Sequence, residues 1–309
     1  MNDVQEKIPI RDPYDEKVIR ERIRRRKEAE KRRRKRQKQI LLSCAIIVII
    51  CVVVIVALLL PGKDSSTGNL TAGSVEEEKS VYEKIEYCNT DYIERYEAYA
   101  ELNPDMAVAD VVWRVNANLD KPKYEYDIPV SGYDIDMIVN KYYKVPEDYK
   151  PSDLELFENY YLRKEAGEAY EKMRDAAAEE NLKIYITSAY RSVEYQRGLY
   201  NRYLGRDPQE AVDRYSARPG HSEHHLGLAI DIAAPGGSQR DFVNTPEYEW
   251  VKENCHKYGF IIRYLKETEE ITGYEFEPWH LRYVGAEISN DMKNKHINNF
   301  EEYHVKYLE

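Results

Sequence analysis

Residues 221–231 read His-Ser-Glu-His-His-Leu-Gly-Leu-Ala-Ile-Asp, a stretch in which three imidazoles precede an apolar, strand-like run that contains a carboxylate. A second polar cluster, Glu277-Pro278-Trp279-His280, follows about fifty residues later. Together the two clusters can supply two imidazoles, one aspartate and one spare glutamate. A hydrolytic zinc site uses this set: three protein ligands, an open position for water and a base beside it.

His224 and Asp231 are seven residues apart, with Gly227 between them. On a strand that begins at Leu228, Asp231 points to one face, and Gly227 lets the chain bend so that His224 returns to that face. A carboxylate within an apolar run needs a partner, and a metal ion is one of the few adequate ones. The alternative is a structural aspartate that caps a turn, with the histidines on the surface.

The second cluster favours the metal. His280 lies three residues after Glu277, and Pro278 stiffens the backbone between them. His280 can be the third ligand, while Glu277 stands off the metal and takes a proton from water. All seven histidines of the chain fall within residues 221–304, which agrees with a function concentrated there.

These residues resemble the VanY-like D-alanyl-D-alanine carboxypeptidases, a family of zinc peptidases of the bacterial cell wall. The family pattern S-x-H-x-x-G-x-A-x-D is matched by Ser222, His224, Gly227, Ala229 and Asp231, and the pattern E-x-W-H by Glu277, Trp279 and His280. Upstream, Ser188-Ala189-Tyr190-Arg191-Ser192 with Gln196 is similar to the family's substrate segment. The resemblance covers roughly residues 110–290.

The resemblance implies a role for each matched residue. The Zn²⁺ ligands would be His224, Asp231 and His280, and Glu277 would be the catalytic base. Arg191 would act in both catalysis and substrate binding, because a guanidinium suits a carboxylate or a developing oxyanion; a surface salt bridge is its alternative role. The remaining peptide contacts would come from Gln196, Ser222 and Trp279.

One position departs from the family pattern. The residue after the ligand histidine is often small and polar, or Gln, in such proteins, but here it is His225. The choice of ligand is therefore ambiguous by one residue, and the spacing to Asp231 favours His224. His225 and His221 could instead line the cleft.

The charge of the chain is unevenly divided. Its net charge is −10, yet residues 1–39 hold 16 Lys and Arg against 8 Asp and Glu, while the rest holds 30 against 48. A body that bound nucleic acid should be the basic part, so no nucleic-acid partner is expected. The basic run could by itself be a nuclear signal or an RNA-binding arm, but it ends directly against an apolar segment.

Residues Ile40–Leu60 form that segment, which has 21 residues and no charge. As a helix it would be about 32 Å long, close to the thickness of a bilayer core. A cleaved signal peptide is the rival interpretation, but both the basic head and the apolar run are too long for one. The pattern predicts a single-pass protein in the cell membrane with a cytoplasmic N-terminus.

Three further segments follow from this topology. Residues 1–39 would be a basic cytoplasmic tail that contacts anionic lipid headgroups. Residues 61–80 are small, polar and acidic, which is typical of a flexible linker. Residues 81–309 would then be an extracellular zinc peptidase domain.

Periodicity within this domain mixes helices and short strands. Helices are predicted at 155–181, 193–204 and 248–258, and strands at 137–139, 182–188, 228–233, 260–262 and 279–284, with a loop at 205–220. The absence of a regular β-α-β rhythm favours an α+β class with a small, mostly antiparallel sheet flanked by helices. The resemblance implies the same class, as a hedgehog/DD-peptidase-like fold.

Cys88 and Cys255 are the two cysteines of this domain, and neither belongs to a C-x-x-C motif. A structural zinc ribbon is therefore not expected. The two could pair as a disulfide on the oxidising side of the membrane or remain unpaired thiols.

The expected function is that of a membrane-anchored zinc carboxypeptidase that removes the C-terminal D-alanine from peptidoglycan stem peptides. An L,D-carboxypeptidase or a peptidoglycan endopeptidase could use the same site. A non-catalytic, wall-binding ectodomain is the alternative from another class. Glu277 argues against it, because a module that only binds needs no base.

Overall fold

The structure, a computed structural model, describes residues 80–125, 127–130 and 134–308. The predicted basic tail (1–39), the transmembrane segment (40–60) and all but the last residue of the linker (61–80) lie outside the described residues. Among the helices of the described ranges, none is long and apolar enough to cross a membrane.

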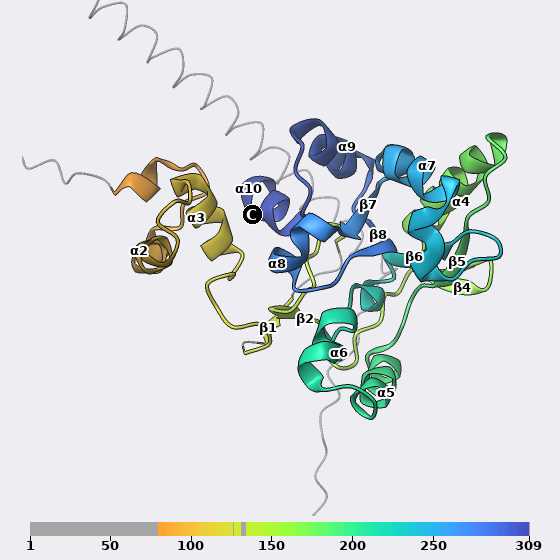
Figure 1. Cartoon of the computed structure of the whole chain (residues 1–309), viewed down its shortest axis with the longest axis horizontal. Coiled ribbons are helices and arrows are strands. Elements are labelled where there is room, and N and C mark those ends of the chain that lie inside the picture. Colours follow the sequence, from red (N-terminus) through yellow and green to blue (C-terminus); the bar gives the residue numbers. More distant parts are fainter. Residues whose placement is uncertain (1–79, 126, 131–133, 309) are drawn as a thin grey trace, which may run out of the picture. The chain divides into compact units, whose positions relative to one another are not determined.

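The largest sheet of the described part has four antiparallel strands in the order β5-β6-β8-β7 (Figure 1). The strands are β5 (Tyr185–Ser188), β6 (Ala229–Ala233), β7 (Phe260–Tyr264) and β8 (Glu277–Tyr283). Along the sequence, helices precede, separate and follow these strands, but the described residues show no regular β-α-β repeat. The predicted α+β class with a mostly antiparallel sheet is thereby confirmed.

Strand β6 is buried along its whole length, as its apolar run predicts. Helix α4 (Lys164–Glu179) covers the same core with one face, because its buried residues recur every three or four positions. The residues of this face are Ala166, Gly167, Tyr170, Met173 and Ala177. All of them except Gly167 belong to one hydrophobic cluster with Ile230 and Leu281 of the two central strands, which gives those strands a rigid support.

The predicted helix at 155–181 is wrong in its first third. Residues Leu154–Phe157 (β3) and Tyr160–Arg163 (β4) form an antiparallel hairpin, and the helix begins at Lys164. Glu158 turns the hairpin with a φ of 53°. Its carboxylate accepts bonds from the Tyr170 hydroxyl (2.9 Å) and the Ile186 amide (3.2 Å), so tertiary contacts hold the turn.

Two more expectations need correction. Helix α6 (Gln209–Tyr215) lies within the predicted loop 205–220. Residues 137–139 form no strand, and the Met137 carbonyl accepts a bond from the side chain of Arg282 (2.7 Å) in place of a strand partner. Helix α5 (Val193–Leu204), in contrast, has the predicted bounds, and the Ser192 side chain caps it by accepting from the Tyr195 amide.

The chain before the sheet contributes helices α2 (Ile93–Leu102) and α3 (Val108–Asn116), two 3₁₀ turns (Val81–Lys84 and Thr90–Tyr92), and the short parallel pair β1 (Ile128–Pro129) and β2 (Tyr143–Lys144). The other helices are α7 (Pro246–Asn254), α8 (Glu269–Thr272), α9 (Ala286–Lys295) and α10 (Phe300–Tyr307). Further 3₁₀ turns are η3 (Glu223–Leu226), η4 (Gln239–Asn244), η5 (Cys255–Tyr258) and η6 (Lys266–Thr268). Helix α10 packs on α3 through Val305, Trp113 and Ala117.

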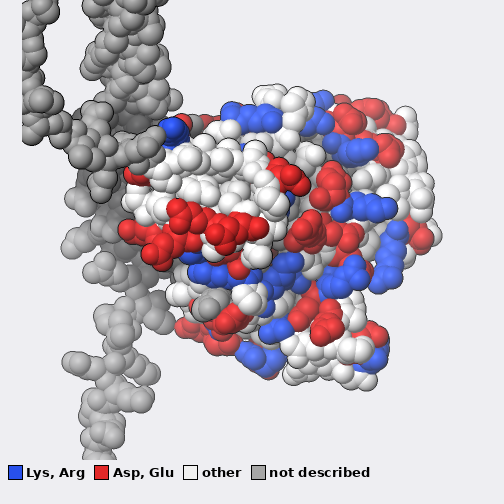
Figure 2. Space-filling model, turned by 60° about the vertical axis from the view of Figure 1, so that its left-hand side comes forward, with Lys and Arg blue, Asp and Glu red and all other residues white. Residues whose placement is uncertain are grey.

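Both cysteines of the described part are free; Cys88 is half-buried and Cys255 is buried. Of the two alternatives from the sequence, the structure has unpaired thiols. On the face of the molecule in Figure 2, acidic and basic side chains lie beside one another in short stretches, and neither sign covers the whole face.

Candidate metal centre and catalytic pocket

Asp231 and His280 meet through strand register. They are paired residues of the neighbouring strands β6 and β8, while Ser188 at the end of β5 pairs with Asp231 from the other side. Opposed residues of an antiparallel pair project to the same face of a sheet. The carboxylate and the imidazole therefore reach one point from the middle of a rigid sheet.

His224 comes from the 3₁₀ turn η3, which precedes β6. Gly227 ends this turn in the left-handed region, at a φ of 63°. A Cβ at this position would lie 2.7 Å from Cδ2 of Leu154 and 3.1 Å from Cγ of Arg163. Only glycine fits here, and the bend that it allows brings His224 back toward Asp231, as the spacing of the three residues predicts.

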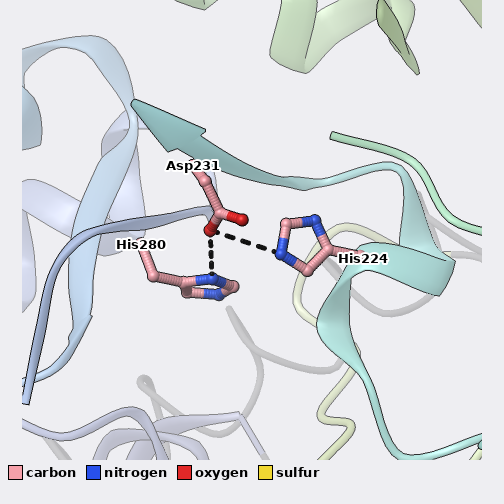
Figure 3. Close-up of side chains that lie close together, drawn as sticks. All are labelled: His224, Asp231 and His280. Carbon is pink, nitrogen blue, oxygen red and sulfur yellow. Dashed lines mark hydrogen bonds and ion pairs between the residues drawn. The ribbon is translucent and has the colours of Figure 1, made fainter. Parts of the chain in front are cut away.

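The three predicted ligands point at one another (Figure 3). Oδ1 of Asp231 lies 3.4 Å from Nε2 of His224 and 3.0 Å from Nδ1 of His280, and all three side chains are almost fully buried. Ligand atoms about 2.0–2.1 Å from a tetrahedral zinc ion stand about 3.3 Å apart. The spacing and the His₂Asp donor set thus fit zinc.

Hydrogen bonds decide which nitrogen of each imidazole faces the metal. Nδ1 of His224 donates to the Ala189 carbonyl at 2.7 Å, which leaves the Nε2 lone pair toward Asp231. Nε2 of His280 lies 3.4 Å from a Glu223 oxygen, which leaves Nδ1 toward Asp231. The site therefore combines Nε2 of one histidine with Nδ1 of the other.

The electrostatics of these side chains agree with a cation position. Burial, together with the Arg191 charge, lowers the pKa of His224 to about 4, so this imidazole is a neutral ligand. Burial alone would raise the pKa of Asp231, but the neighbouring histidines and Arg191 hold it well below its usual range. Burial would lower the pKa of His280, but Asp231 and Glu223 raise it to about 9, since two carboxylates favour positive charge there.

Glu277 begins β8 and lines the same pocket. Its Oε2 lies 3.9 Å from Nδ1 of His280, and its side chain is only 13% exposed. Burial, with some repulsion from Asp231, raises the pKa of Glu277 to about 7. A carboxylate with such a pKa can both accept and return a proton at neutral pH.

Arg191 lies just after the end of β5, and its guanidinium contacts the metal ligands His224 and Asp231. Its guanidinium donates to Oδ2 of Asp231 (2.8 Å), to the Ser188 hydroxyl (3.0 Å) and to Oε1 of Gln196 (3.3 Å). These three bonds, with a contact of 3.1 Å between its Nη2 and Nε2 of His224, set its orientation, and the side chain remains 19% exposed toward the pocket. A guanidinium held in this way is preorganised to meet a negative oxygen.

The pocket has a volume of about 450 Å³ and brings together all the residues predicted for the site: Arg191, Gln196, Ser222, His224, Asp231, Glu277, Trp279 and His280. Gln196 is 1% exposed, and its amide nitrogen donates to Ser216 and Ala217. It joins the Arg191 side chain to the 216–217 segment of the pocket wall. Trp279 is half-buried and Ser222 is buried at the pocket surface.

The ambiguity between His224 and His225 is resolved by hydrogen bonding. His225 donates from Nδ1 to the Arg191 carbonyl (2.7 Å) and accepts the Gly220 amide at Nε2 (3.1 Å). His221 bonds the Asn140 carbonyl (2.8 Å) and Asp127 (3.2 Å). Neither histidine lines the pocket, so the expectation that they face the cleft is wrong.

The sequence-based predictions omit one residue that lies beside the metal ligands. Glu223 precedes His224 in the first cluster and is fully buried. Its carboxylate contacts three side chains, those of His280, Arg263 and Arg282. The sequence holds a signal for it, because Arg263 and Arg282 stand within otherwise apolar strands. A cation in such a place needs a buried acidic partner.

Comparisons with known proteins agree with this site. The family model VanY, D-alanyl-D-alanine carboxypeptidase, matches residues 159–286. The bifunctional D-Ala-D-Ala dipeptidase and D-Ala-D-Ala carboxypeptidase VanXYC of Enterococcus gallinarum is 31% identical over 176 residues, which cover 54% of this chain and 92% of that protein. The solved LdcB LD-carboxypeptidase, whose structure concerns peptidoglycan recognition, is 38% identical with a TM-score of 0.51, covering 54% of this chain and 84% of that one.

YodJ of Bacillus subtilis (strain 168), which is named as a putative carboxypeptidase, is 38% identical over 182 residues, or 55% of this chain. The chain spans 57% to 66% of the length of three curated relatives that include YodJ.

Fold and site together define a protein with the zinc-peptidase fold and a His-Asp-His centre. The chain belongs to the VanY family of D-alanyl-D-alanine carboxypeptidases. The predicted ligands His224, Asp231 and His280 come together as one metal centre, whose donor set and spacing fit the predicted zinc cofactor. The roles predicted for Glu277, Arg191, Gln196, Ser222 and Trp279 stay predictions.

Proposed function

We propose that this protein is a membrane-anchored zinc carboxypeptidase that removes the C-terminal D-alanine from peptidoglycan stem peptides. The observation that carries the proposal is the placement of Glu277, 3.9 Å from a metal-ligand nitrogen, in one pocket with Arg191. Family membership supports the reaction class. Binding alone would need neither a poised base nor an oriented guanidinium.

The residues divide the chemistry between them. Zinc, when bound, polarises the scissile carbonyl and makes water a stronger nucleophile. Glu277 takes the proton of the attacking water and returns it to the leaving amine, for which a pKa of about 7 suits it. Arg191 donates to the oxygen on which negative charge develops or to the terminal carboxylate of the peptide.

The test uses the purified full-length chain and two defined stem peptides, a pentapeptide and a tetrapeptide. A pentapeptide that ends in D-Ala-D-Ala should lose one alanine, as measured by mass spectrometry, and a chelator should stop the reaction until zinc is restored. A zinc-loaded chain that leaves the pentapeptide intact would contradict the proposal.

An L,D-carboxypeptidase is the second candidate, and its specific support is the 38% identity to LdcB. The same assay separates the two, because an L,D-enzyme shortens a tetrapeptide with one terminal D-alanine and a D,D-enzyme does not. A cross-linked stem-peptide dimer added to the assay detects endopeptidase activity, since its cleavage yields two monomers.

We also propose that Ile40–Leu60 anchors the protein, with the basic tail at the cytoplasmic, anionic lipid surface and the pocket outside. The support is the uncharged run of 21 residues after a basic block. Protease added to intact cells should remove an epitope at the C-terminus and spare one at the N-terminus. Protection of both epitopes, or release of the protein into the medium, would contradict this topology.

A further inference from the structure

A cluster of four buried charges lies next to the metal ligand His280. Its members are Glu223, Arg263, Arg282 and Glu301, whose side chains are 0% or 1% exposed. They come from four segments of the chain: η3, β7, β8 and α10. Two positive and two negative charges balance one another, and this charge cluster is thereby tolerated in the core.

Glu223 is the member that connects the cluster to the metal site. Its Oε1 accepts from Nε of Arg263 (2.8 Å) and from Nη1 of Arg282 (3.1 Å). Its other oxygen, Oε2, lies 3.4 Å from Nε2 of His280. The two arginines thus fix one carboxylate oxygen and aim the other at the imidazole.

Glu301 holds this arrangement from the far side. Its two carboxylate oxygens accept from Nη1 (3.0 Å) and Nη2 (2.6 Å) of Arg263, a bidentate pair with a defined plane. Asn140 donates to the same carboxylate at 3.2 Å. Glu301 lies on α10, beyond the residues 159–286 that the family model matches.

A purely structural role explains this cluster poorly. Buried ion pairs contribute little net stability compared with apolar residues of similar volume, because both charges lose their hydration. A ligating histidine, however, needs an acceptor for its second ring N–H, which fixes its tautomer and orientation and raises its basicity. Near Nε2 of His280, Glu223 is the acceptor that the structure provides.

We propose that Glu223 is a positioning residue of the zinc site, which orients His280, and that Glu301 keeps it in place through Arg263. Helix α10 is then part of the metal centre. The inference rests on the site of the proposed carboxypeptidase, but its test measures zinc binding. The inference about Glu223 and Glu301 would therefore stand even if the protein cleaved no peptide.

The first variant is Glu223→Asp in the full-length chain. It keeps the negative charge between the two arginines but draws the carboxylate back from His280 by one methylene. Zinc affinity, measured by competition with a chelating dye, should fall about 10- to 100-fold, and the visible spectrum of the Co²⁺-loaded chain should change. A variant with the wild-type circular dichroism spectrum that binds zinc within about twofold of wild type would overturn the proposal.

Glu301→Gln tests the remote support without touching the imidazole, and Glu302→Gln is its matched control. Glu302 lies on the same helix but pairs with Lys306 at a half-buried position. Glu301→Gln should weaken zinc binding, whereas Glu302→Gln should bind zinc as wild type does. Lower thermal stability of Glu301→Gln with unchanged zinc affinity would mean a structural role only and would refute the link to α10.

The unmodified chain offers a test that does not depend on how a variant folds. Histidine ¹⁵N NMR of the zinc-loaded protein should place the ring proton of His280 on Nε2, where Glu223 can accept it. A proton on Nδ1 would overturn the proposal.

Discussion

Asp231 and His280 are opposed residues of the antiparallel pair β6 and β8, although 49 residues separate them in the sequence. Their side chains share one face of the sheet because of this register. A slip of one residue would send one of them to the opposite face. The metal site therefore depends on the same backbone ladder that forms the core.

Glu277→Gln removes the base and keeps the shape of the side chain. The rate of peptide cleavage should fall about 10²- to 10⁴-fold, because no group of suitable pKa remains to take the proton. Zinc content, measured by atomic absorption, should be unchanged since Glu277 is not a ligand. Cleavage at more than about a tenth of the wild-type rate would refute its role.

Arg191→Ala should lower kcat about 10²- to 10³-fold if the guanidinium stabilises the developing oxyanion. If Arg191 instead holds the terminal carboxylate, KM should rise while kcat changes less. Steady-state kinetics on the same peptide separate the two roles. Unchanged kinetics in both parameters would refute both roles and leave Arg191 only its contacts with neighbouring side chains.

Gly227→Ala should destabilise the fold and weaken zinc binding, because the added Cβ would meet Leu154 at 2.7 Å at a φ of 63°. Gly236→Ala is the matched control, since its φ is 79° but nothing lies within 4 Å of the new Cβ. The free energy of unfolding of the control should fall only by what a left-handed backbone conformation costs a non-glycine residue, about 1–2 kcal/mol. Urea unfolding of the metal-free variants measures both losses, and equal losses would contradict the steric argument.

Lys141 provides a pH-dependent contribution to stability. It is 2% exposed, its ammonium lies 4.0 Å from the centre of the Tyr274 ring, and burial lowers its pKa to about 7. Between pH 7 and the usual lysine value of 10.5, the unfolded chain holds a proton that the folded chain has released, so stability rises with pH.

Lys141→Met should accordingly be more stable than wild type at pH 7 and lose this advantage as the pH rises. The difference in the free energy of unfolding should shrink by up to about 1.4 kcal/mol per pH unit between about pH 7 and 9. Lys252→Met, which removes an exposed lysine, is the control for loss of charge. A difference that stays constant with pH would contradict the burial argument.

Local sequence predicts some elements better than others. Helix α5 has its predicted bounds because Ser192 caps it and its buried residues share one face. The β3-β4 hairpin, predicted as helix, carries apolar residues at spacings that fit either structure. Contacts of Glu158 with Tyr170 and Ile186 decide for the hairpin, and these partners lie 12 and 28 residues away.

By itself, the sequence indicated the two clusters that hold the ligands and favoured His224 over His225, since residue type and the spacing around Gly227 act over a few residues. Tertiary structure alone decided which nitrogen of each imidazole faces the metal. Those choices depend on the Ala189 carbonyl and on Glu223, which lie 35 and 57 residues from the histidines they contact. Hydrogen-bond partners so far apart in the chain are brought together by the packing of the whole domain, and no local pattern encodes them.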